Sequence, residues 1–251
     1  MSRMELGVSG KVAIITGAAR GIGAGMARAF AAEGTKVLIA DISETVEETA
    51  RAIAAGGHSV TGVVADVTNP DDVNRLIEAA VGKYGRLDIL VNNAGFPRDG
   101  YISNLTVTDW DSVMDVCLKG AFLCTRASIK HMSQNSHGRI INISSRAHLG
   151  NPGQSNYSAA KAGLLGFTRA IALESGKFGI TSNAIAPGYI RTELIAALPN
   201  SEAVTERALA LAPIKRPGEI DDIASAALFL ASERAGYISG EVLHVTGGRY
   251  G

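Results

Sequence analysis

Seven short apolar runs alternate with longer stretches of helical periodicity along nearly the whole chain, and this alternation restricts the fold more than any other feature. The first run, Val12–Thr16, is β-branched and apolar at successive positions, which is typical of a strand buried on both faces. The other runs are Val37–Ala40, Val60–Val64, Leu87–Val91, Arg139–Ser144, Thr181–Ile185 and Val242–Val245. The spacing predicts helices over Gly21–Glu33, Ser43–Ala55, Pro70–Tyr84, Thr108–Met132, Asn156–Phe178 and Glu219–Ala231.

Strands that alternate with helices favour right-handed βαβ crossovers, and therefore a parallel sheet covered on both faces. We expect an α/β fold with a doubly wound, mostly parallel, seven-stranded sheet and helices on both faces. No linker, repeat or charge block interrupts the 251 residues, so residues 1–251 are expected to form a single domain. Residues 189–213 have sparse periodicity and two prolines, which is consistent with a mobile lid over a substrate or with a peripheral surface helix.

Composition excludes several classes of function. The 24 basic and 24 acidic side chains give a net charge of zero, without the basic field that nucleic-acid or membrane binding would favour. The five histidines lack metal-site spacing, so no metal is expected. Two cysteines, no signal-peptide pattern and no long apolar run favour a cytoplasmic protein that does not enter a membrane.

The first strand leads directly into a glycine-rich turn, Thr16–Gly23, and then into a helix. Glycines in such a turn let the backbone approach a pyrophosphate, and the helix N-terminus adds N–H donors. The spacing differs from G-x-G-x-x-G, and a tight βα turn would use similar residues. Asp41, however, ends the second strand 24 residues after Gly17, near the position of a ribose-binding acid. A dinucleotide site is therefore the preferred interpretation.

Two side chains bear on which dinucleotide binds. Asp41 could accept hydrogen bonds from both adenosine ribose hydroxyls and would repel a 2′-phosphate, which favours NAD. Arg20 argues for NADP, because a guanidinium in the turn could hold that phosphate. The carboxylate has a fixed place at a strand end, whereas Arg20 can turn into solvent. We therefore expect NAD, with NADP less favoured.

A second group of polar residues follows the fifth strand. Tyr157 and Lys161 are spaced i, i+4 and lie on one face of a predicted helix. A free phenol, with a pKa of about 10, is a poor base at neutral pH, and a nearby ammonium stabilises the phenolate. Ser144 and Ser145 end the preceding strand, where a hydroxyl could bond a substrate oxygen as charge develops. These residues suit proton transfer at a carbinol oxygen.

Taken together, these motifs resemble the short-chain dehydrogenases/reductases. The matching features, from about Lys11 to Gly248, are the T-G-x-x-x-G-x-G turn, Asn92–Gly95, the serine, the Tyr157/Lys161 pair and Pro187–Gly188. The resemblance implies a Rossmann fold, a homotetramer, and hydride transfer between a nicotinamide and a secondary alcohol or ketone. It also implies Tyr157 as the acid/base and Lys161 as the ribose anchor that stabilises the phenolate.

The same resemblance implies a full set of site residues. The catalytic residues are Ser145, Tyr157 and Lys161. Residues of the turn and the second strand would hold the pyrophosphate and ribose: Gly17, Arg20, Gly21, Ile22, Gly23, Asp41 and Ile42. Asp66 and Val67 would border the adenine, and Asn93, Ala94 and Gly95 the adenosine ribose. Tyr157 and Lys161 also contact the cofactor, and Pro187, Gly188, Ile190 and Thr192 lie on the carboxamide side.

Two departures from the family pattern affect the chemistry. Cys117 stands where the family usually has an asparagine that supports a water relay to the lysine, and a thiol is a weak substitute. Cys117 could equally be a small buried apolar residue. Counting back from Tyr157 selects Ser144 as the catalytic serine, whereas aligning the strands selects Ser145. We choose Ser145, because a strand's register shifts less readily than a loop's length.

The substrate is less constrained. Phe96–Asp99 and Gly240–Gly248 resemble 3-oxoacyl-carrier-protein reductases, but basic residues that would receive an acidic carrier protein are few. We therefore expect an NAD-linked secondary-alcohol dehydrogenase or ketone reductase, with 3-oxoacyl-[acyl-carrier-protein] reductase as the alternative. An S-adenosylmethionine-dependent transferase would have no use for the Tyr157/Lys161 pair, and a silent dinucleotide sensor is favoured only by Cys117. His148 could border the substrate or be structural.

Overall fold

The central layer of the protein is a sheet of seven strands, in which apolar residues face both sides. The computed structural model describes residues 5–197 and 201–249. The strands are β1 (Val12–Thr16), β2 (Lys36–Asp41), β3 (Val60–Val64), β4 (Ile89–Asn92), β5 (Gly138–Ile143), β6 (Ile180–Pro187) and β7 (Val242–Val245). They are ordered β3-β2-β1-β4-β5-β6-β7, and every neighbouring pair is parallel. The predicted α/β class and doubly wound sheet are confirmed.

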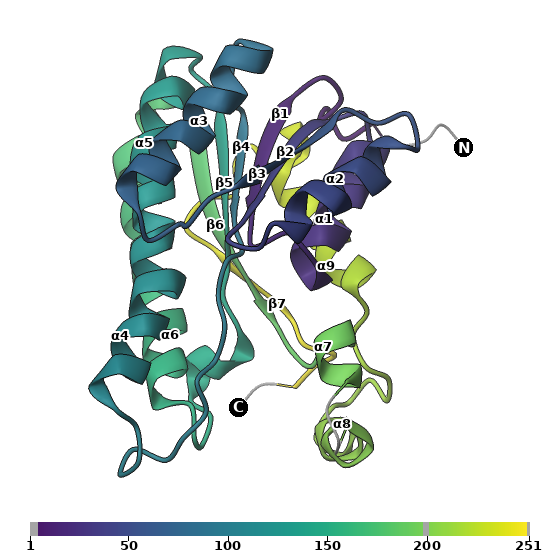
Figure 1. Ribbon diagram of the computed structural model, residues 1–251, viewed down its shortest axis with the longest axis vertical. Coiled ribbons are helices and arrows are strands. Elements are labelled where there is room, and N and C mark those ends of the chain that lie inside the picture. The colour runs from purple at the N-terminus through teal and green to yellow at the C-terminus, as the bar shows by residue number, and fades with distance from the viewer. Residues whose placement is uncertain (1–4, 198–200, 250–251) are drawn as a thin grey trace.

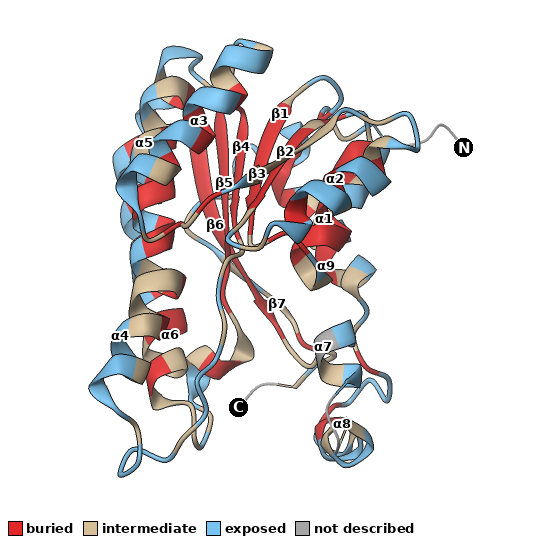
Figure 2. Cartoon of the chain, in the orientation of Figure 1, coloured by how far each residue is buried: buried red, intermediate tan, exposed pale blue. Residues whose placement is uncertain are grey.

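Helices cover both faces of the sheet (Figure 1). One layer contains α1 (Gly21–Ala32), α2 (Thr45–Ala54) and α9 (Ile220–Ala231). The opposite layer contains α3 (Pro70–Tyr84), α4 (Val107–Met114), α5 (Gly120–Gln134) and α6 (Ser155–Ser175). Ala13 and Ile15 of β1 pack in the core under the first layer, whereas Val12 and Ile14 pack under the second. The five inner strands, from β2 to β6 in the sheet order, are buried on both faces, whereas the edge strands β3 and β7 are partly exposed (Figure 2).

The long helix predicted over Thr108–Met132 is interrupted. The segment Asp115–Lys119, between α4 and α5, is π-helical and contains the buried residue Cys117. A π-helical turn inserts one extra residue into the helix, and such turns are frequent at functional sites. The periodicity of the sequence did not reveal this insertion, which lies where the helix contacts α6.

The segment 189–213, for which the sequence left a mobile lid or a peripheral surface helix open, carries two helices. They are α7 (Glu193–Ala196) and α8 (Ser201–Ala210), and residues 198–200 lie outside the described part of the chain. In Figure 1 they stand apart from the helical layers, beyond the end of β7. The side chains of Tyr189 and Thr205 join the start of the segment to α8, with their hydroxyl oxygens 2.6 Å apart.

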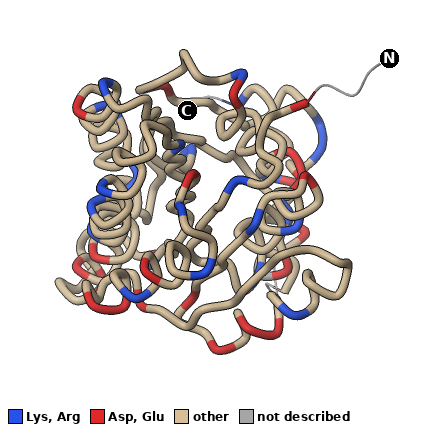
Figure 3. Tube along the Cα trace, turned by 90° about the horizontal axis from the view of Figure 1, so that it is seen from above, with Lys and Arg blue, Asp and Glu red and all other residues tan. Residues whose placement is uncertain are grey.

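The order of the strands creates a switch point. The chain builds β1, β2 and β3 outward in one direction and then returns to place β4 on the other side of β1. The loops after β1 and β4 therefore diverge, and ligands of doubly wound sheets bind in such crevices. Acidic and basic residues are interspersed around the periphery (Figure 3), consistent with the net charge of zero. Among the described residues, the structure has no helix long and apolar enough to span a membrane.

Candidate functional site

The turn after β1 has room for backbone but not for side chains. Gly17 has a φ of 63°, and a Cβ added there would lie 2.6 Å from the Cα of Ala94. A Cβ on Gly23 would collide with the carbonyl oxygen of Gly17. Gly21 has a φ of 60° and faces open space. Glycine is thus required for the shape of the turn, and the space in front of it suits the close approach of a pyrophosphate.

Asn93, which follows β4, holds this turn in place through hydrogen bonds. Its side-chain amide donates hydrogen bonds to the carbonyl oxygens of Thr16 and Gly17, at 2.9 and 2.8 Å. The hydroxyl of Thr16 in turn accepts from the backbone N–H groups of Asn93 and Ala94, at 3.1 and 3.2 Å. The two loops at the switch point are therefore one bonded unit. The sequence analysis did not identify this role of Thr16.

The carboxylate of Asp41 is fixed at the end of β2. Its Oδ2 accepts from the backbone N–H of Ala19 at 3.1 Å, and its Oδ1 accepts from the N–H of Ser43 at 3.0 Å. Each oxygen retains a further lone pair that can accept from a hydroxyl. Arg20 is exposed, and so is Ile42, at 71%. The geometry thus gives the carboxylate a set position, while the guanidinium is solvated.

Asp66 and Val67 follow β3 at the same edge of the sheet. The Oδ1 of Asp66 accepts from the N–H and the hydroxyl of Thr68, both at 2.8 Å, so the carboxylate stabilises its own turn. The N–H of Asp66 donates to Asp72 at 3.0 Å, and this bond is the main cause that holds the pKa of the Asp72 carboxyl below its usual range. Val67 is buried against Gly120, at the start of α5. The sequence places Asp72 in the first turn of α3, as observed, but does not indicate its bond to Asp66.

Lys161 and Tyr157 meet on the inner face of α6. Lys161 is 2% exposed, and its Nζ donates to the carbonyl oxygen of Ile143, the last residue of β5, at 2.7 Å. The same Nζ lies 5.4 Å from the centre of the Tyr157 ring. An ammonium has three donors, so Lys161 can hold the strand end and still bond another acceptor. Tyr157 is partly exposed, which leaves its hydroxyl within reach of a ligand.

The two candidate serines differ in what their hydroxyls do. Ser144 is 3% exposed, and its hydroxyl donates to the carbonyl oxygen of Lys161 at 2.9 Å. Ser145 is partly exposed, and its Oγ accepts from the N–H of Ala147 at 3.1 Å. The hydroxyl proton of Ser145 therefore remains available to an external acceptor, whereas that of Ser144 is used inside the fold.

Asn156 positions the start of α6 and was missed by the motif analysis. It is fully buried, and its side-chain oxygen accepts from the N–H of Tyr157 at 2.7 Å. Its amide donates to the carbonyl oxygens of Arg98, at 3.1 Å, and Asp109, at 3.4 Å. These bonds tie Tyr157 to the loop after β4 and to α4. An asparagine next to the tyrosine was the only sequence signal, and it does not by itself indicate burial.

Cys117 lies beside the Tyr157/Lys161 pair. It packs in a small apolar cluster with Ala160 and Tyr157, and its Sγ is 3.9 Å from the carbonyl oxygen of Phe96. A Cβ added to Gly95 would lie 3.0 Å from this Sγ and 3.2 Å from the Nζ of Lys161. The thiol thus occupies the space between the loop after β4 and the lysine, and offers that space only a weak hydrogen-bonding group.

The residues after β6 form a further wall of the candidate site. The N–H of Gly188 donates to the carbonyl oxygen of Val245 at 2.9 Å, and a Cβ on Gly188 would lie 2.9 Å from the Cα of Thr246. Ile190 is buried, and the hydroxyl of Thr192 accepts from the N–H of Ile195 at the start of α7. This wall is continuous with the segment that follows β7.

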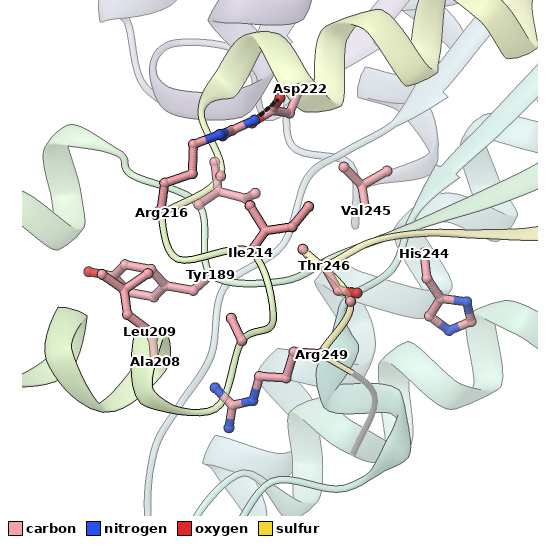
Figure 4. Close-up of a pocket in the computed structure, with 15 residues that line it drawn as sticks. Tyr189, Ala208, Leu209, Ile214, Arg216, Asp222, His244, Val245, Thr246 and Arg249 are labelled. Atoms are coloured by element: carbon pink, nitrogen blue, oxygen red, sulfur yellow. Dashed lines mark hydrogen bonds and ion pairs between the residues drawn. The ribbon is translucent and has the colours of Figure 1, made fainter.

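A cavity of about 330 Å³ opens between α8 and the end of β7 (Figure 4). Its lining includes Tyr189, Ile190, Leu209, Arg216, His244, Thr246 and Arg249. Neither Tyr157 nor the glycine turn is among the described residues that line the cavity. Thr246, which does line it, lies directly against Gly188. His148 contacts His244, with their Nε2 atoms 2.9 Å apart. His148 therefore lies behind the wall of this cavity.

The described residues fit a bound dinucleotide. The glycine turn packs closely against the loop after β4 at Gly17 and within itself at Gly23, while Gly21 at the start of α1 faces open space; Asp41 is a fixed acceptor, and Lys161 has spare donors. These groups lie after β1, β2 and β5, at the carboxyl ends of neighbouring or nearby strands. The arrangement can bind a phosphate-bearing ligand at one end and exchange a proton at the other.

Comparison with known proteins gives consistent matches over the whole chain. Residues 17–249 match the family model described as enoyl-(acyl carrier protein) reductase. The chain is 47% identical over 245 residues to (2S)-[(R)-hydroxy(phenyl)methyl]succinyl-CoA dehydrogenase subunit BbsD of Thauera aromatica, covering 97% of this chain and 98% of that protein. It is 43% identical over 245 residues to 3-oxoacyl-[acyl-carrier-protein] reductase of Synechocystis, with 96% and 97% covered. A crystal structure assigned as a short-chain alcohol dehydrogenase from Sinorhizobium meliloti superposes with a TM-score of 0.92 at 37% identity, covering 98% of each chain.

Proposed function

The chain belongs to the short-chain dehydrogenase/reductase family of nicotinamide-dependent oxidoreductases, and we propose that it interconverts a secondary alcohol and a ketone with NAD(H). The observation that carries the proposal is the approach of the Lys161 ammonium to the Tyr157 ring, 5.4 Å from its centre, together with the partly exposed Ser145 in the loop after β5. Tyr157 and Ser145 are both partly exposed, and each has a hydroxyl that can bond a reacting oxygen.

The proton steps follow from the positions of these side chains. The nicotinamide, when bound, supplies or accepts the hydride. Tyr157 donates its phenolic proton to the substrate oxygen in reduction and accepts it in oxidation. Lys161, held by the carbonyl oxygen of Ile143, stabilises the phenolate through its charge and keeps donors for a ribose. Ser145 donates its hydroxyl proton to the same substrate oxygen while charge develops there.

The preference for NAD rests on Asp41. Two backbone N–H groups hold its carboxylate, so the side chain cannot turn away from a 2′-phosphate without losing both bonds. A phosphate at 4 Å from this charge would be disfavoured by about 4 kcal/mol per charge pair at the protein surface. Arg20 would have to leave solvent to compensate. The remaining cofactor contacts that we propose are those of the glycine turn and of Ile42, Asp66, Val67, Asn93, Ala94, Gly95, Pro187, Gly188, Ile190 and Thr192.

Three features beyond the reaction are part of the proposal. Residues 189–213 act as a lid, because α8 borders the cavity next to Gly188.

The protein is a homotetramer in the cytoplasm. The apolar side chains of Phe122 on α5 and Leu173 on α6 are 43% and 87% exposed, and a neighbouring copy would cover them. Sedimentation of the purified protein tests the tetramer.

The alternative function is reduction of a 3-oxoacyl thioester. It is favoured by relatives such as the Synechocystis reductase and by the succinyl-CoA derivative that the Thauera relative's name specifies. Both functions use the same proton donor and differ in the group attached to the reacting carbon. The choice between them is therefore a choice of substrate and cofactor.

The test is a substrate panel followed at the absorbance of the reduced nicotinamide. Neutral ketones, oxo acids and acetoacetyl-coenzyme A are each offered with NADH and with NADPH at equal concentration. We expect kcat/KM for NADH to exceed that for NADPH at least tenfold, and Tyr157→Phe to abolish turnover with the fold intact. Higher kcat/KM with NADPH and acetoacetyl-coenzyme A would select the alternative. Full activity of Tyr157→Phe would contradict both functions.

A further inference from the structure

The glycine turn is also held from α2, by a side chain that no motif includes. Thr49 is half-buried on the inner part of this helix, and its Oγ1 donates a hydrogen bond to the carbonyl oxygen of Ala19 at 2.7 Å. Ala19 lies in the turn between Gly17 and Gly21 and is itself buried. The bond therefore reaches the loop that the proposed function assigns to the cofactor.

Ala19 is held on both sides of its Cα atom. Its carbonyl oxygen accepts from Thr49, and its N–H donates to the Oδ2 of Asp41 at 3.1 Å. These two groups belong to the two planar peptide units that flank the Cα atom, so the two bonds together constrain both backbone dihedrals of Ala19. The hydroxyl of Thr49 thus sets the direction from which the N–H of Ala19 meets the carboxylate.

The helix that carries Thr49 is itself firmly placed. In Figure 1, α2 lies beside α1 in the layer that covers one face of the sheet. Its apolar side is buried in the core under that layer, through Val46, Ala50 and Ile53. It also lies close against β3, because a Cβ added to Gly62 would be 2.7 Å from the carbonyl oxygen of Val46 and 2.8 Å from the Cα of Glu47. These contacts fix the backbone from which Thr49 projects.

A purely structural bond of the same kind occurs elsewhere in the protein. Thr35, just before β2, donates from its Oγ1 to the carbonyl oxygen of Val8 at 3.0 Å. That bond lies at the opposite end of β2 from Asp41, away from the candidate site. The bond of Thr49 differs because the residue that accepts it also donates to Asp41. This difference separates a role in the site from a role in stability alone.

We propose that Thr49 is a positioning residue for the adenosine end of the cofactor: through Ala19 it orients the Asp41 carboxylate that accepts hydrogen bonds from the ribose hydroxyls. Without the hydroxyl of Thr49, the buried carbonyl of Ala19 loses its donor and the loop turns to satisfy it. Asp41 then keeps the N–H of Ser43 and loses the fixed bond at its Oδ2. This inference rests on the proposed function and adds a residue to its cofactor specificity.

The test compares ADP with 2′-deoxy-ADP, which differ only in one ribose hydroxyl, by titration calorimetry. We expect wild type to bind ADP at least fivefold more tightly than 2′-deoxy-ADP. Thr49→Val, which keeps the shape and removes the hydroxyl, should reduce this ratio to less than twofold, and Thr49→Ser should restore it. Thr35→Val makes the same chemical change at the other end of β2, and this matched control should keep the wild-type ratio. An unchanged ratio in Thr49→Val would overturn the inference.

A double-mutant cycle tests whether Thr49 acts through Asp41. Asp41→Ala removes the carboxylate, and we expect Thr49→Val to change the Kd for ADP less than twofold in that background. A further loss as large as in the wild-type background would show that Thr49 acts independently of Asp41, and would overturn the inference. Should Thr49→Val fail to fold, Thr49→Ala repeats both measurements, because alanine favours the helix more than valine does.

Binding and turnover fail separately, which distinguishes this inference from the proposed function. If wild type prefers ADP to 2′-deoxy-ADP and Thr49→Val loses that preference, the inference is supported even when no ketone is reduced, and the proposed function alone fails. If wild type reduces ketones with NADH while Thr49→Val keeps the preference, the inference alone fails. Equal affinity of wild type for the two nucleotides would overturn the inference, because Asp41 would then not bind the ribose.

Discussion

The hydroxyl of Ser144 donates a hydrogen bond of 2.9 Å to the backbone carbonyl oxygen of Lys161, so this serine joins the end of β5 to α6. The hydroxyl of the adjacent Ser145 accepts a hydrogen bond from the N–H of Ala147. Ser145 is partly exposed. Two neighbouring serines that look interchangeable in the sequence therefore differ in function: one supports the lysine, and the other is available to a ligand.

This difference predicts opposite phenotypes for two alanine variants. Ser145→Ala removes a donor to the reacting oxygen, and we expect kcat to fall about 100-fold with little change in stability. Ser144→Ala removes a buried hydrogen bond, and we expect a loss of about 1 kcal/mol of unfolding free energy with kcat within about threefold of wild type. Steady-state kinetics and urea unfolding of both variants measure the two effects. A greater loss of kcat in Ser144→Ala would reverse the assignment.

Asn93→Ala should weaken cofactor binding indirectly, by loosening the glycine turn and not by removing a contact to the cofactor's phosphates. The variant loses both bonds from the side chain to Thr16 and Gly17, so the glycine turn is no longer fixed to the loop after β4. We expect the Kd for NADH to rise about tenfold, equivalent to about 1.4 kcal/mol, measured by quenching of protein fluorescence. Asn135→Ala, at the exposed end of α5, is the control. An unchanged Kd would show that the turn holds its shape alone.

Gly95→Ala should impair catalysis through Cys117 and Lys161. The added Cβ would lie 3.0 Å from the Sγ of Cys117 and 3.2 Å from the Nζ of Lys161, so one of them must move. We expect kcat/KM to fall at least tenfold. The double variant Gly95→Ala, Cys117→Ala frees the space of the sulfur and should recover at least threefold over Gly95→Ala alone. Additive effects of the two substitutions would mean that the sulfur is not the obstacle.

Two glycines of α3 form a matched pair for stability. Gly82 is exposed inside the helix with nothing within 4 Å of an added Cβ, so Gly82→Ala should stabilise the protein by about 0.5–1 kcal/mol. Gly85 ends the helix with a φ of 77°, so Gly85→Ala should destabilise it by about 1 kcal/mol, although its Cβ also meets open space. Urea unfolding at one temperature measures both. Effects of the same sign would contradict the argument from φ.

Cys124 predicts a loss of stability at high pH. Burial raises the pKa of its thiol from 9.0 to about 12, so the folded protein keeps the proton where the unfolded chain releases it. The stabilisation is complete below about pH 9 and is lost progressively between pH 9 and about 12. Relative to Cys124→Ala, the unfolding free energy of wild type should fall by up to about 1.4 kcal/mol per pH unit above pH 9. A pH-independent difference between the two proteins would show that the thiol does not titrate on unfolding.

Local signals were sufficient for the secondary structure of the sheet. The prediction for β1 matches the structure in full, and those for β2–β7 either match or differ only at their ends. Apolar β-branched runs bounded by polar or glycine residues are strong signals for strands. The helix over Thr108–Met132 was predicted as continuous, whereas Asp115–Lys119, which lies against α6, is π-helical. For the segment that contains α7 and α8 the sequence left a mobile lid or a peripheral surface helix open, because its periodicity is sparse.

The sequence by itself determined the α/β class, the glycine turn, the acid at the end of β2 and the Tyr157/Lys161 pair, because each depends on residues that are close along the chain. Only the tertiary structure decided that Ser144 is bonded to Lys161, that Asn93 holds the turn, and that Asn156 holds Tyr157. It alone brought His148 to His244, 96 residues further along the chain. Such pairings arise from the order of the strands in the sheet, which places β5 and β7 on either side of β6, and no local pattern encodes that order.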